Sequence, residues 1–205
     1  MNTASTQEIN RAVIADRAST IRRALNGRSI VLVGIMGVGK STIGKRLSQY
    51  LDIEFVDADK EIEKAAGMSV TDIFDQFGEE AFRTGEKKVI RRLLDEGQKI
   101  LATGGGAFMN EATRDEIQER GVSLWLKADL DVLMKRVQRR SDRPLLKTED
   151  PEATMKALLD ERNPIYALAD LEIESRTVSR DVIAGEVIDM MADALPEITE
   201  ARGWK

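Results

Sequence analysis

The stretch Gly34-Ile35-Met36-Gly37-Val38-Gly39-Lys40-Ser41 decides the fold, because it matches the G-x-x-x-x-G-K-[ST] spacing of a phosphate-binding P-loop. Its glycines let the backbone turn several N–H groups toward the phosphate oxygens of a nucleotide. Lys40 adds a positive charge for the β- and γ-phosphates, and the Ser41 hydroxyl can ligate Mg2+. A plain glycine-rich turn is the alternative, but the full pattern rarely arises by chance. The stretch therefore predicts a nucleotide-binding loop.

The residues on both sides of this loop fit the same prediction. Residues 29–33 form an uninterrupted run rich in β-branched side chains, which is typical of a strand buried on both faces of a parallel sheet. After the loop, Ile43, Leu47 and Leu51 recur at helical spacing. A strand, a glycine loop and a helix in this order are the elements that a P-loop requires.

Composition limits the classes of protein that the chain can represent. Its 205 residues, 42% of them hydrophobic, fit one α/β domain better than two. A net charge of −5 argues against a general nucleic-acid binder. The chain has no cysteine, which excludes disulfides and thiolate metal sites, and no histidine, which removes the commonest general base. A proton acceptor would then be a carboxylate.

The sequence also bears on membranes and on location. It contains no run of 18 apolar residues, and its N-terminus lacks the apolar core of a secretory signal. We therefore expect no membrane partner and a cytoplasmic protein.

Residues 5–26 have the pattern of an amphipathic helix. Ser5 and Glu8 form a candidate capping box, and Gly27 can end the helix. Its apolar stripe is expected to consist of Ile9, Val13, Ile21 and Leu25. A packed or oligomer-contacting helix is favoured over a targeting peptide, because targeting peptides are poor in acidic residues and this segment contains Glu8 and Asp16.

Four further apolar runs alternate with helical patterns, at residues 53–56, 100–103, 122–126 and 171–173. This alternation predicts a mostly parallel sheet covered on both faces, with ligands bound at the carboxyl ends of its strands. Two charged segments fit the sheet less well. Residues 61–92, broken at Gly67 and Gly78, are expected to form a substrate-binding lobe, and residues 139–154, with Pro144 and Pro151, a mobile lid.

Two aspartates follow the second apolar run. In an extended chain, the two-residue step from Asp57 to Asp59 would point both side chains to the same side, toward the phosphates. Mg2+ held by ATP phosphates takes one or two protein oxygens, which suits Ser41 and Asp57 and leaves Asp59 for a hydroxyl. Alternatively, one or both aspartates cap the helix that starts near Lys60.

A triple glycine and three arginines complete the candidate set. Residues 104–106 are three glycines at a strand end, which suggests close approach of the backbone to a ligand, with a flexible turn as the alternative. Arg83, Arg143 and Arg162 could bind carboxylate or phosphate through their rigid guanidinium fork. The chain has many arginines, however, and composition alone does not select these three.

Taken together, these motifs strongly resemble the shikimate kinase family in order and spacing, over roughly residues 29–190. The resemblance implies a P-loop, nucleoside-monophosphate-kinase-like α/β fold of three layers with a five-stranded parallel sheet, a small substrate-binding lobe and a mobile lid. It also implies transfer of the γ-phosphate of ATP to the 3-hydroxyl of shikimate, in the chorismate and aromatic amino acid pathway. The implied division is a helical extension at 1–27, a kinase domain at 28–195 and a tail at 196–205.

The resemblance carries roles onto residues of this chain. Lys40, Asp59 and Arg143 would be catalytic, and Ser41 and Asp57 would support Mg2+. ATP would contact Gly37, Val38, Gly39, Lys40, Ser41, Thr42, Arg136 and Arg143. Shikimate would contact Asp59, Arg83, Gly104, Gly105, Gly106 and Arg162.

One departure from the family concerns the adenine site, because residues 174–179 lack the proline that can follow the last strand. A monomer is expected, with oligomerisation through the N-terminal helix as the alternative. A gluconate kinase is the nearest enzymatic rival, and the paired aspartates, Phe82-Arg83 and the triple glycine favour shikimate over it. A nucleoside-monophosphate kinase is disfavoured because an aspartate would repel its phosphate acceptor. A non-catalytic nucleotide-binding module would be expected to lose Lys40, Asp59 or Arg83.

Overall fold

The computed structural model describes residues 3–137 and 148–204, with side chains from residue 12 onward. Five strands form one sheet in the order β2-β3-β1-β4-β5, and every neighbouring pair is parallel. The strands are β1 (Ser29–Val33), β2 (Phe55–Asp57), β3 (Ile100–Ala102), β4 (Gly121–Lys127) and β5 (Leu171–Glu174). Each of the five apolar runs overlaps one strand, so the predicted five-stranded parallel sheet is confirmed.

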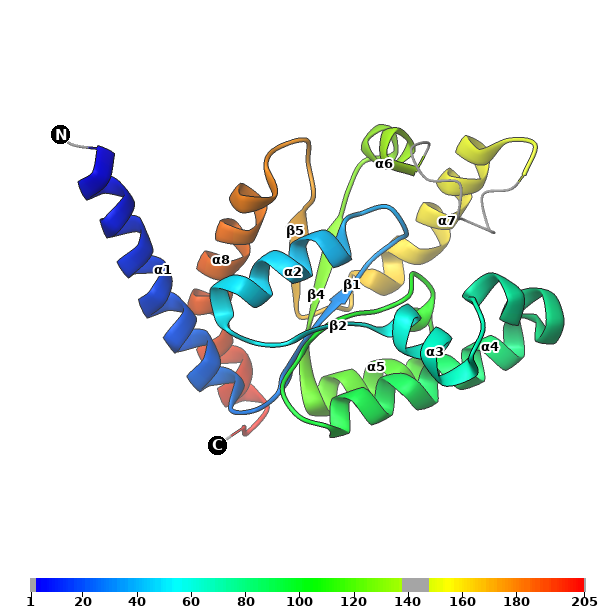
Figure 1. The fold of residues 1–205 in the computed structure, drawn as a ribbon, viewed down its shortest axis with the longest axis horizontal. Coiled ribbons are helices and arrows are strands. Elements are labelled where there is room, and N and C mark those ends of the chain that lie inside the picture. The colour runs from blue at the N-terminus through cyan, green and yellow to red at the C-terminus, as the bar shows by residue number, and fades with distance from the viewer. Residues whose placement is uncertain (1–2, 138–147, 205) are drawn as a thin grey trace.

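Helices cover both faces of this sheet (Figure 1), which gives the predicted three layers. Because parallel strands connect by right-handed crossovers, α2 lies on the face opposite α4 and α5, and α1 and α8 pack with α2. The helical elements are α1 (Thr3–Leu25), α2 (Lys40–Leu51), α3 (Ala58–Ala66), α4 (Val70–Asp95), η1 (Ala107–Met109), α5 (Glu111–Arg120), α6 (Leu130–Val137), α7 (Pro151–Tyr166) and α8 (Arg180–Ala201). In the part of the chain that the structure describes, no helix is both long enough and apolar enough to span a membrane.

The core lies on the two central strands. Every residue of β1 is buried, as are the first six residues of β4, because helices cover both faces of these strands. The α2 residues Ile43, Leu47 and Leu51 are also buried, as their helical spacing predicts. This packing fixes the P-loop, which joins β1 to α2, at the carboxyl edge of the sheet.

The N-terminal segment is helical, but two details of the prediction were wrong. Helix α1 begins at Thr3, so Ser5 lies inside it and is not the capping residue. Val13 is 49% exposed, because the helix turns a neighbouring face toward α8. The stripe on that face consists of Ile14, Ala18, Ile21 and Leu25.

Helix α1 is tied to the rest of the domain by polar contacts as well. Arg22 Nη1 donates to the carbonyl of Leu51, 2.9 Å away, and so satisfies one of the last carbonyls of the P-loop helix α2. Arg17 forms ion pairs with Asp189 and Asp193 of α8. These contacts hold α1 against the two helices beside the nucleotide loop.

The C-terminal residues are also part of the packed structure. Helix α8 continues to Ala201, beyond residue 195, where we expected a tail to begin. Trp204 packs on the core, with the guanidinium groups of Arg28 and Arg202 at 4.2 and 5.0 Å from its ring centre. The division into extension, kinase domain and tail stays a prediction.

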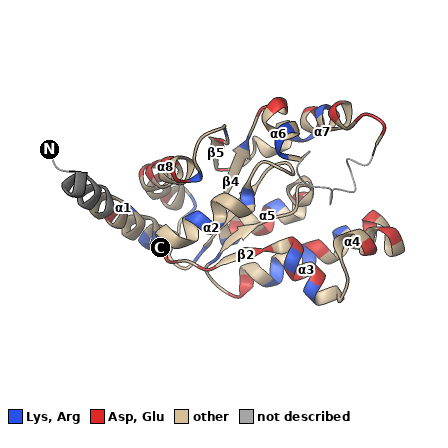
Figure 2. Cartoon of the chain, turned by 45° about the horizontal axis from the view of Figure 1, so that its top comes forward, with Lys and Arg blue, Asp and Glu red and all other residues tan. Residues whose placement is uncertain are grey.

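The charged segment 61–92 forms a small helical lobe that carries interleaved acidic and basic side chains (Figure 2). It breaks at the two predicted glycines: Gly67 ends α3 with φ 68°, and Gly78 kinks α4 with φ 78°. Ile62, Ile73 and Phe82 form a hydrophobic cluster of their own under this lobe. The lobe therefore has hydrophobic packing of its own, and one side of it borders the cavity described below.

Candidate functional site

The P-loop has the backbone that its glycines predict. Gly34, Gly37 and Gly39 have φ angles of 130°, 81° and 107°, a backbone conformation that residues other than glycine rarely adopt. Lys40 Nζ lies across the loop and donates to the carbonyls of Gly34 at 2.6 Å and Ile35 at 3.0 Å. The lysine side chain thus folds back onto the first two residues of the loop.

The N-terminus of the P-loop helix lacks the side-chain cap that begins four other helices of the described chain. No side chain caps α2, whereas α4, α5, α7 and α8 begin with the capping side chains of Ser69, Asn110, Asp150 and Ser179. The first N–H groups of a helix need partners outside the helix, and an anion suits them because of the helix dipole. The end of α2 therefore fits a phosphate group.

Ser41 and Asp57 form an oxygen pair next to this helix end. Ser41 Oγ donates to Asp57 Oδ2 at 2.7 Å. Asp57 occupies the N-cap position of α3 but makes no capping hydrogen bond, so the alternative of a simple helix cap is not supported. Among the described residues, no three His, Cys, Asp or Glu side chains converge as a metal cage. Two oxygens beside a phosphate site fit Mg2+, which takes few protein ligands and shares the phosphates.

Asp59 reaches the same cavity by a different route from the one we predicted. Strand β2 ends at Asp57 and α3 begins at Ala58, so Asp59 lies in the first turn of a helix and not in extended chain. The expected two-residue extended step was therefore wrong. Asp57 and Asp59 nevertheless both line one cavity, because the strand ends at its edge.

The triple glycine makes room for charged side chains. A Cβ atom at Gly104 would lie 2.5 Å from Glu86 Oε1 and 2.9 Å from Asp59 Oδ1, and one at Gly106 would collide with the Arg83 guanidinium. None of the three glycines has a left-handed φ. Close approach of this backbone to a ligand stays a prediction, and the groups that the structure places against Gly104 and Gly106 are side chains of the site itself.

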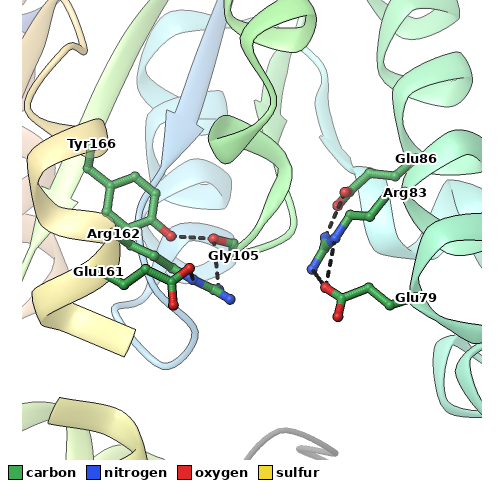
Figure 3. Close-up of polar contacts among 7 residues, drawn as sticks. All are labelled: Glu79, Arg83, Glu86, Gly105, Glu161, Arg162 and Tyr166. Carbon is green, nitrogen blue, oxygen red and sulfur yellow. Dashed lines mark hydrogen bonds and ion pairs between the residues drawn. The ribbon is translucent and has the colours of Figure 1, made fainter. Parts of the chain in front are cut away.

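Arg83 lies between two glutamates of its own helix (Figure 3). Its Nη1 donates to Glu86 Oε2 at 2.7 Å, and its Nε and Nη2 donate to Glu79 Oε1 at 3.2 and 3.0 Å. Burial lowers the pKa of Arg83, but the charge of Glu86 and the hydrogen bonds of both glutamates outweigh this effect and raise it. The guanidinium therefore stays charged.

Glu86 is a site residue that our list of predicted contacts omitted, although it stands three residues after Arg83 and so on the same helix face. Its side chain is 3% exposed, and its Oε1 has no hydrogen-bond partner among the described residues. Burial raises the pKa of the Glu86 carboxyl, although Arg83 opposes the shift. A buried carboxylate of this kind fixes the position of the arginine.

Helix α7 supplies Arg162 and Tyr166 from the opposite side of the cavity. Arg162 Nη1 donates to the Gly105 carbonyl at 3.4 Å, and the Tyr166 hydroxyl donates to the same oxygen. Burial raises the pKa of the Tyr166 phenol far above its usual range, so the hydroxyl remains a donor. In Figure 3, Arg162 and Arg83 point toward each other from α7 and α4. Tyr166 was not predicted, because only the folded chain brings it to Gly105.

Arg136 connects the P-loop to the segment after the last strand. Its Nη1 donates to the Val38 carbonyl and to Ser175 Oγ, both at 2.9 Å, and its Nη2 donates to the Arg176 carbonyl at 3.0 Å. Val178 lines the cavity in the segment that lacks the proline. Arg143 and residues 138–147, which include most of the expected lid, lie outside the described residues.

These residues share one cavity of about 680 Å3 at the carboxyl ends of the strands. The cavity brings together all of the predicted site residues that the structure describes. They are Gly37, Val38, Gly39, Lys40, Ser41, Thr42, Asp57, Asp59, Arg83, Gly104, Gly105, Gly106, Arg136 and Arg162. The P-loop thus shares a space of small-molecule size with Arg83, Arg162 and Asp59.

The family model described as shikimate kinase matches residues 36–192, which include most of the P-loop, the triple glycine, Arg83 and Arg162. The chain belongs to the shikimate kinase family. The shikimate kinase of Bradyrhizobium diazoefficiens is 58% identical over 177 residues, covering 86% of each chain. The shikimate kinase of Brucella canis is 51% identical over 176 residues, covering 86% of this chain and 88% of the relative.

Solved structures agree with this family assignment. Shikimate kinase from Acinetobacter baumannii in complex with shikimate has a TM-score of 0.80 and 34% identity, covering 84% of this chain and 97% of that one. A gluconokinase from Sinorhizobium meliloti shares the fold with a TM-score of 0.55, but at only 16% identity. The fold is thus common to both kinase families, while the sequence places this chain with the shikimate kinases.

Proposed function

We propose that the chain transfers the γ-phosphoryl group of ATP to the 3-hydroxyl of shikimate, giving shikimate 3-phosphate in the pathway to chorismate and the aromatic amino acids. The observation that carries this proposal is the pair of facing arginines, Arg83 and Arg162, in the cavity that also holds the P-loop and Asp59. A small hydroxy acid needs a cationic partner for its carboxylate and an acceptor for its hydroxyl proton. The cavity offers both opposite a phosphate-binding loop.

On the nucleotide side, Lys40 and the start of α2 are proposed to bind the phosphates. Lys40 would exchange its contacts with the Gly34 and Ile35 carbonyls for the β- and γ-phosphate oxygens. Its charge acts mainly on the transferring group, where negative charge is redistributed in the transition state. Ser41 and Asp57 would hold Mg2+, which neutralises phosphate charge when bound.

On the acceptor side, Asp59 is proposed to orient the 3-hydroxyl and to take its proton. Asp59 lies beside Gly104 and near Glu86, and the negative charge of Asp59 raises the pKa of that buried glutamate. Arg83 and Arg162 would bind the carboxylate from α4 and α7, and the backbone of residues 104–106 would contact the ring. Positioning and electrostatics carry phosphoryl transfer, so the lack of histidine is no obstacle.

Other parts of the assignment remain predictions from the sequence. They are the roles of Arg136 at adenine and of Arg143 in a lid, the monomeric state and the cytoplasmic location. In the segment after the last strand, where the expected proline is absent, Val178 lines the cavity.

Release of ADP, measured with shikimate, gluconate or AMP as acceptor, tests the proposal. We expect turnover with shikimate only, and phosphorus NMR should place the phosphate on the 3-hydroxyl. A Lys40→Ala protein is the control for contaminating kinases, because Lys40 supports the transferring group and not the core. Preferred turnover with gluconate would contradict the substrate, and no turnover with any acceptor would indicate a non-catalytic nucleotide-binding protein.

A further inference from the structure

Two acidic side chains of its own helix engage Arg83. Glu86 accepts a hydrogen bond from Nη1 of Arg83, and a single oxygen of Glu79 accepts hydrogen bonds from both Nε and Nη2. A substrate carboxylate bound in bidentate fashion needs two parallel N–H groups on one edge of a guanidinium. The Nε–Nη2 edge, which offers such a pair, is held by Glu79.

The two glutamates differ in how easily they can leave. The Glu86 side chain is 3% exposed and lies against Gly104, which leaves it little room to move. The Glu79 side chain is 57% exposed and follows directly after the kink at Gly78, where α4 departs from helical geometry. Figure 3 shows its carboxylate at the end of the guanidinium that points toward Arg162. Glu79 is therefore the exchangeable partner of Arg83, and Glu86 the permanent one.

We infer that Glu79 is an internal carboxylate that occupies Arg83 until the carboxylate of the substrate replaces it. The exchange substitutes one anion for another, so Arg83 keeps its charge partner while Glu79 turns into solvent. A neutral analogue gains no ion pair and leaves Glu79 in place. Glu79 thereby restricts this subsite to anionic ligands, at the cost of weaker binding of the correct one. This inference rests on the proposed role of Arg83.

The substitution Glu79→Gln tests the exchange. The neutral amide would compete poorly for Arg83, and exposed ion pairs of this kind are weak, so we expect shikimate to bind about two- to fivefold more tightly. Binding of the neutral methyl ester of shikimate should not change. Glu80→Gln is the matched control. Glu80 is the next residue along the chain, its side chain is exposed, and it is not among the hydrogen-bond partners of Arg83 in the described residues, so the variant removes the same charge without removing a contact with Arg83.

Isothermal titration calorimetry on the full chain measures these dissociation constants, with circular dichroism as the check on folding. Unchanged or weaker shikimate binding by Glu79→Gln would overturn the inference, and so would equal tightening for shikimate and its ester or an equal effect of Glu80→Gln. An Arg83→Ala protein distinguishes failure of the proposed role of Arg83 from failure of the exchange at Glu79. If it binds shikimate normally, the proposed role of Arg83 fails; if it binds weakly while Glu79→Gln has no effect, only the exchange fails.

Discussion

Replacing Gly104 with alanine is the sharpest test of how the triple glycine builds this site. The added methyl group would lie 2.5 Å from Glu86 Oε1 and 2.9 Å from Asp59 Oδ1. Ordinary contact begins at 3.4 Å, so Glu86 must retreat by about 0.9 Å and Asp59 by about 0.5 Å. Glu86 cannot retreat without disturbing its 2.7 Å ion pair with Arg83. One methyl group thus displaces the proposed base, Asp59, and disturbs Arg83, the proposed partner of the substrate carboxylate.

Overpacking of this kind typically costs about 1 to 3 kcal/mol. If the cost falls on the substrate complex, kcat/KM for shikimate decreases about 5- to 150-fold. The Michaelis constant for ATP should change little, because the new methyl group meets no P-loop atom among its nearest contacts. Gly85→Ala is the matched control: it lies in α4, its Cβ would meet nothing within 4 Å, and alanine favours a helix by up to about 1 kcal/mol.

Steady-state kinetics, with shikimate and ATP varied in turn, measure the effect, and thermal unfolding shows how much of the cost falls on stability. Wild-type kcat/KM for shikimate in a folded Gly104→Ala protein would refute the reasoning. An equal loss in Gly85→Ala would refute it as well, because that change adds the same methyl group without a collision.

Three further substitutions probe the other parts of the cavity. Asp59→Asn should lower kcat about a hundred- to ten-thousandfold at little change in the KM for ATP, and wild-type kcat at saturating shikimate would exclude Asp59 as the base. Tyr166→Phe removes one of the two side-chain donors to the Gly105 carbonyl and should lower kcat/KM for shikimate about two- to tenfold. A lower melting temperature with unchanged kinetics would instead show that the role of Tyr166 is purely structural. Burial raises the pKa of Glu86 above its ordinary 4.5, so ionisation of Glu86 destabilises the folded protein. In urea unfolding, the free energy of unfolding of Glu86→Gln should therefore increase relative to that of the wild type as the pH rises above 4.5. A difference that instead grows below 4.5 would contradict that sign.

Features encoded in a few neighbouring residues were predictable from the sequence. The P-loop is local, because the φ angles of its glycines and the start of α2 depend on residues within one turn. The apolar runs predicted the strands, since the central strands are buried by helices on both faces. The helix breaks at Gly67 and Gly78 were predictable for the same local reason.

The buried face of the N-terminal helix and the local structure at Asp59 could not be predicted from the residue pattern alone. Whether α1 buries Val13 or Ile14 depends on where α8 lies, and the helical period alone allows either face. Whether Asp59 continues a strand or begins a helix depends on where β2 stops pairing with β3, which happens at Asp57. Both outcomes were set by neighbours distant in the sequence.

The sequence by itself therefore determined the parallel sheet, the nucleotide loop and the types of residue available for an acidic hydroxylated substrate. The family resemblance had named Arg83 and Arg162, but only the tertiary structure shows that they face one another, because they come from helices on different sides of the cavity. The tertiary structure alone placed Tyr166 and Arg162 on the Gly105 carbonyl, 61 and 57 residues away along the chain. The physical reason is that local hydrogen bonding and periodicity fix elements, whereas contacts between elements depend on the packing of the whole core.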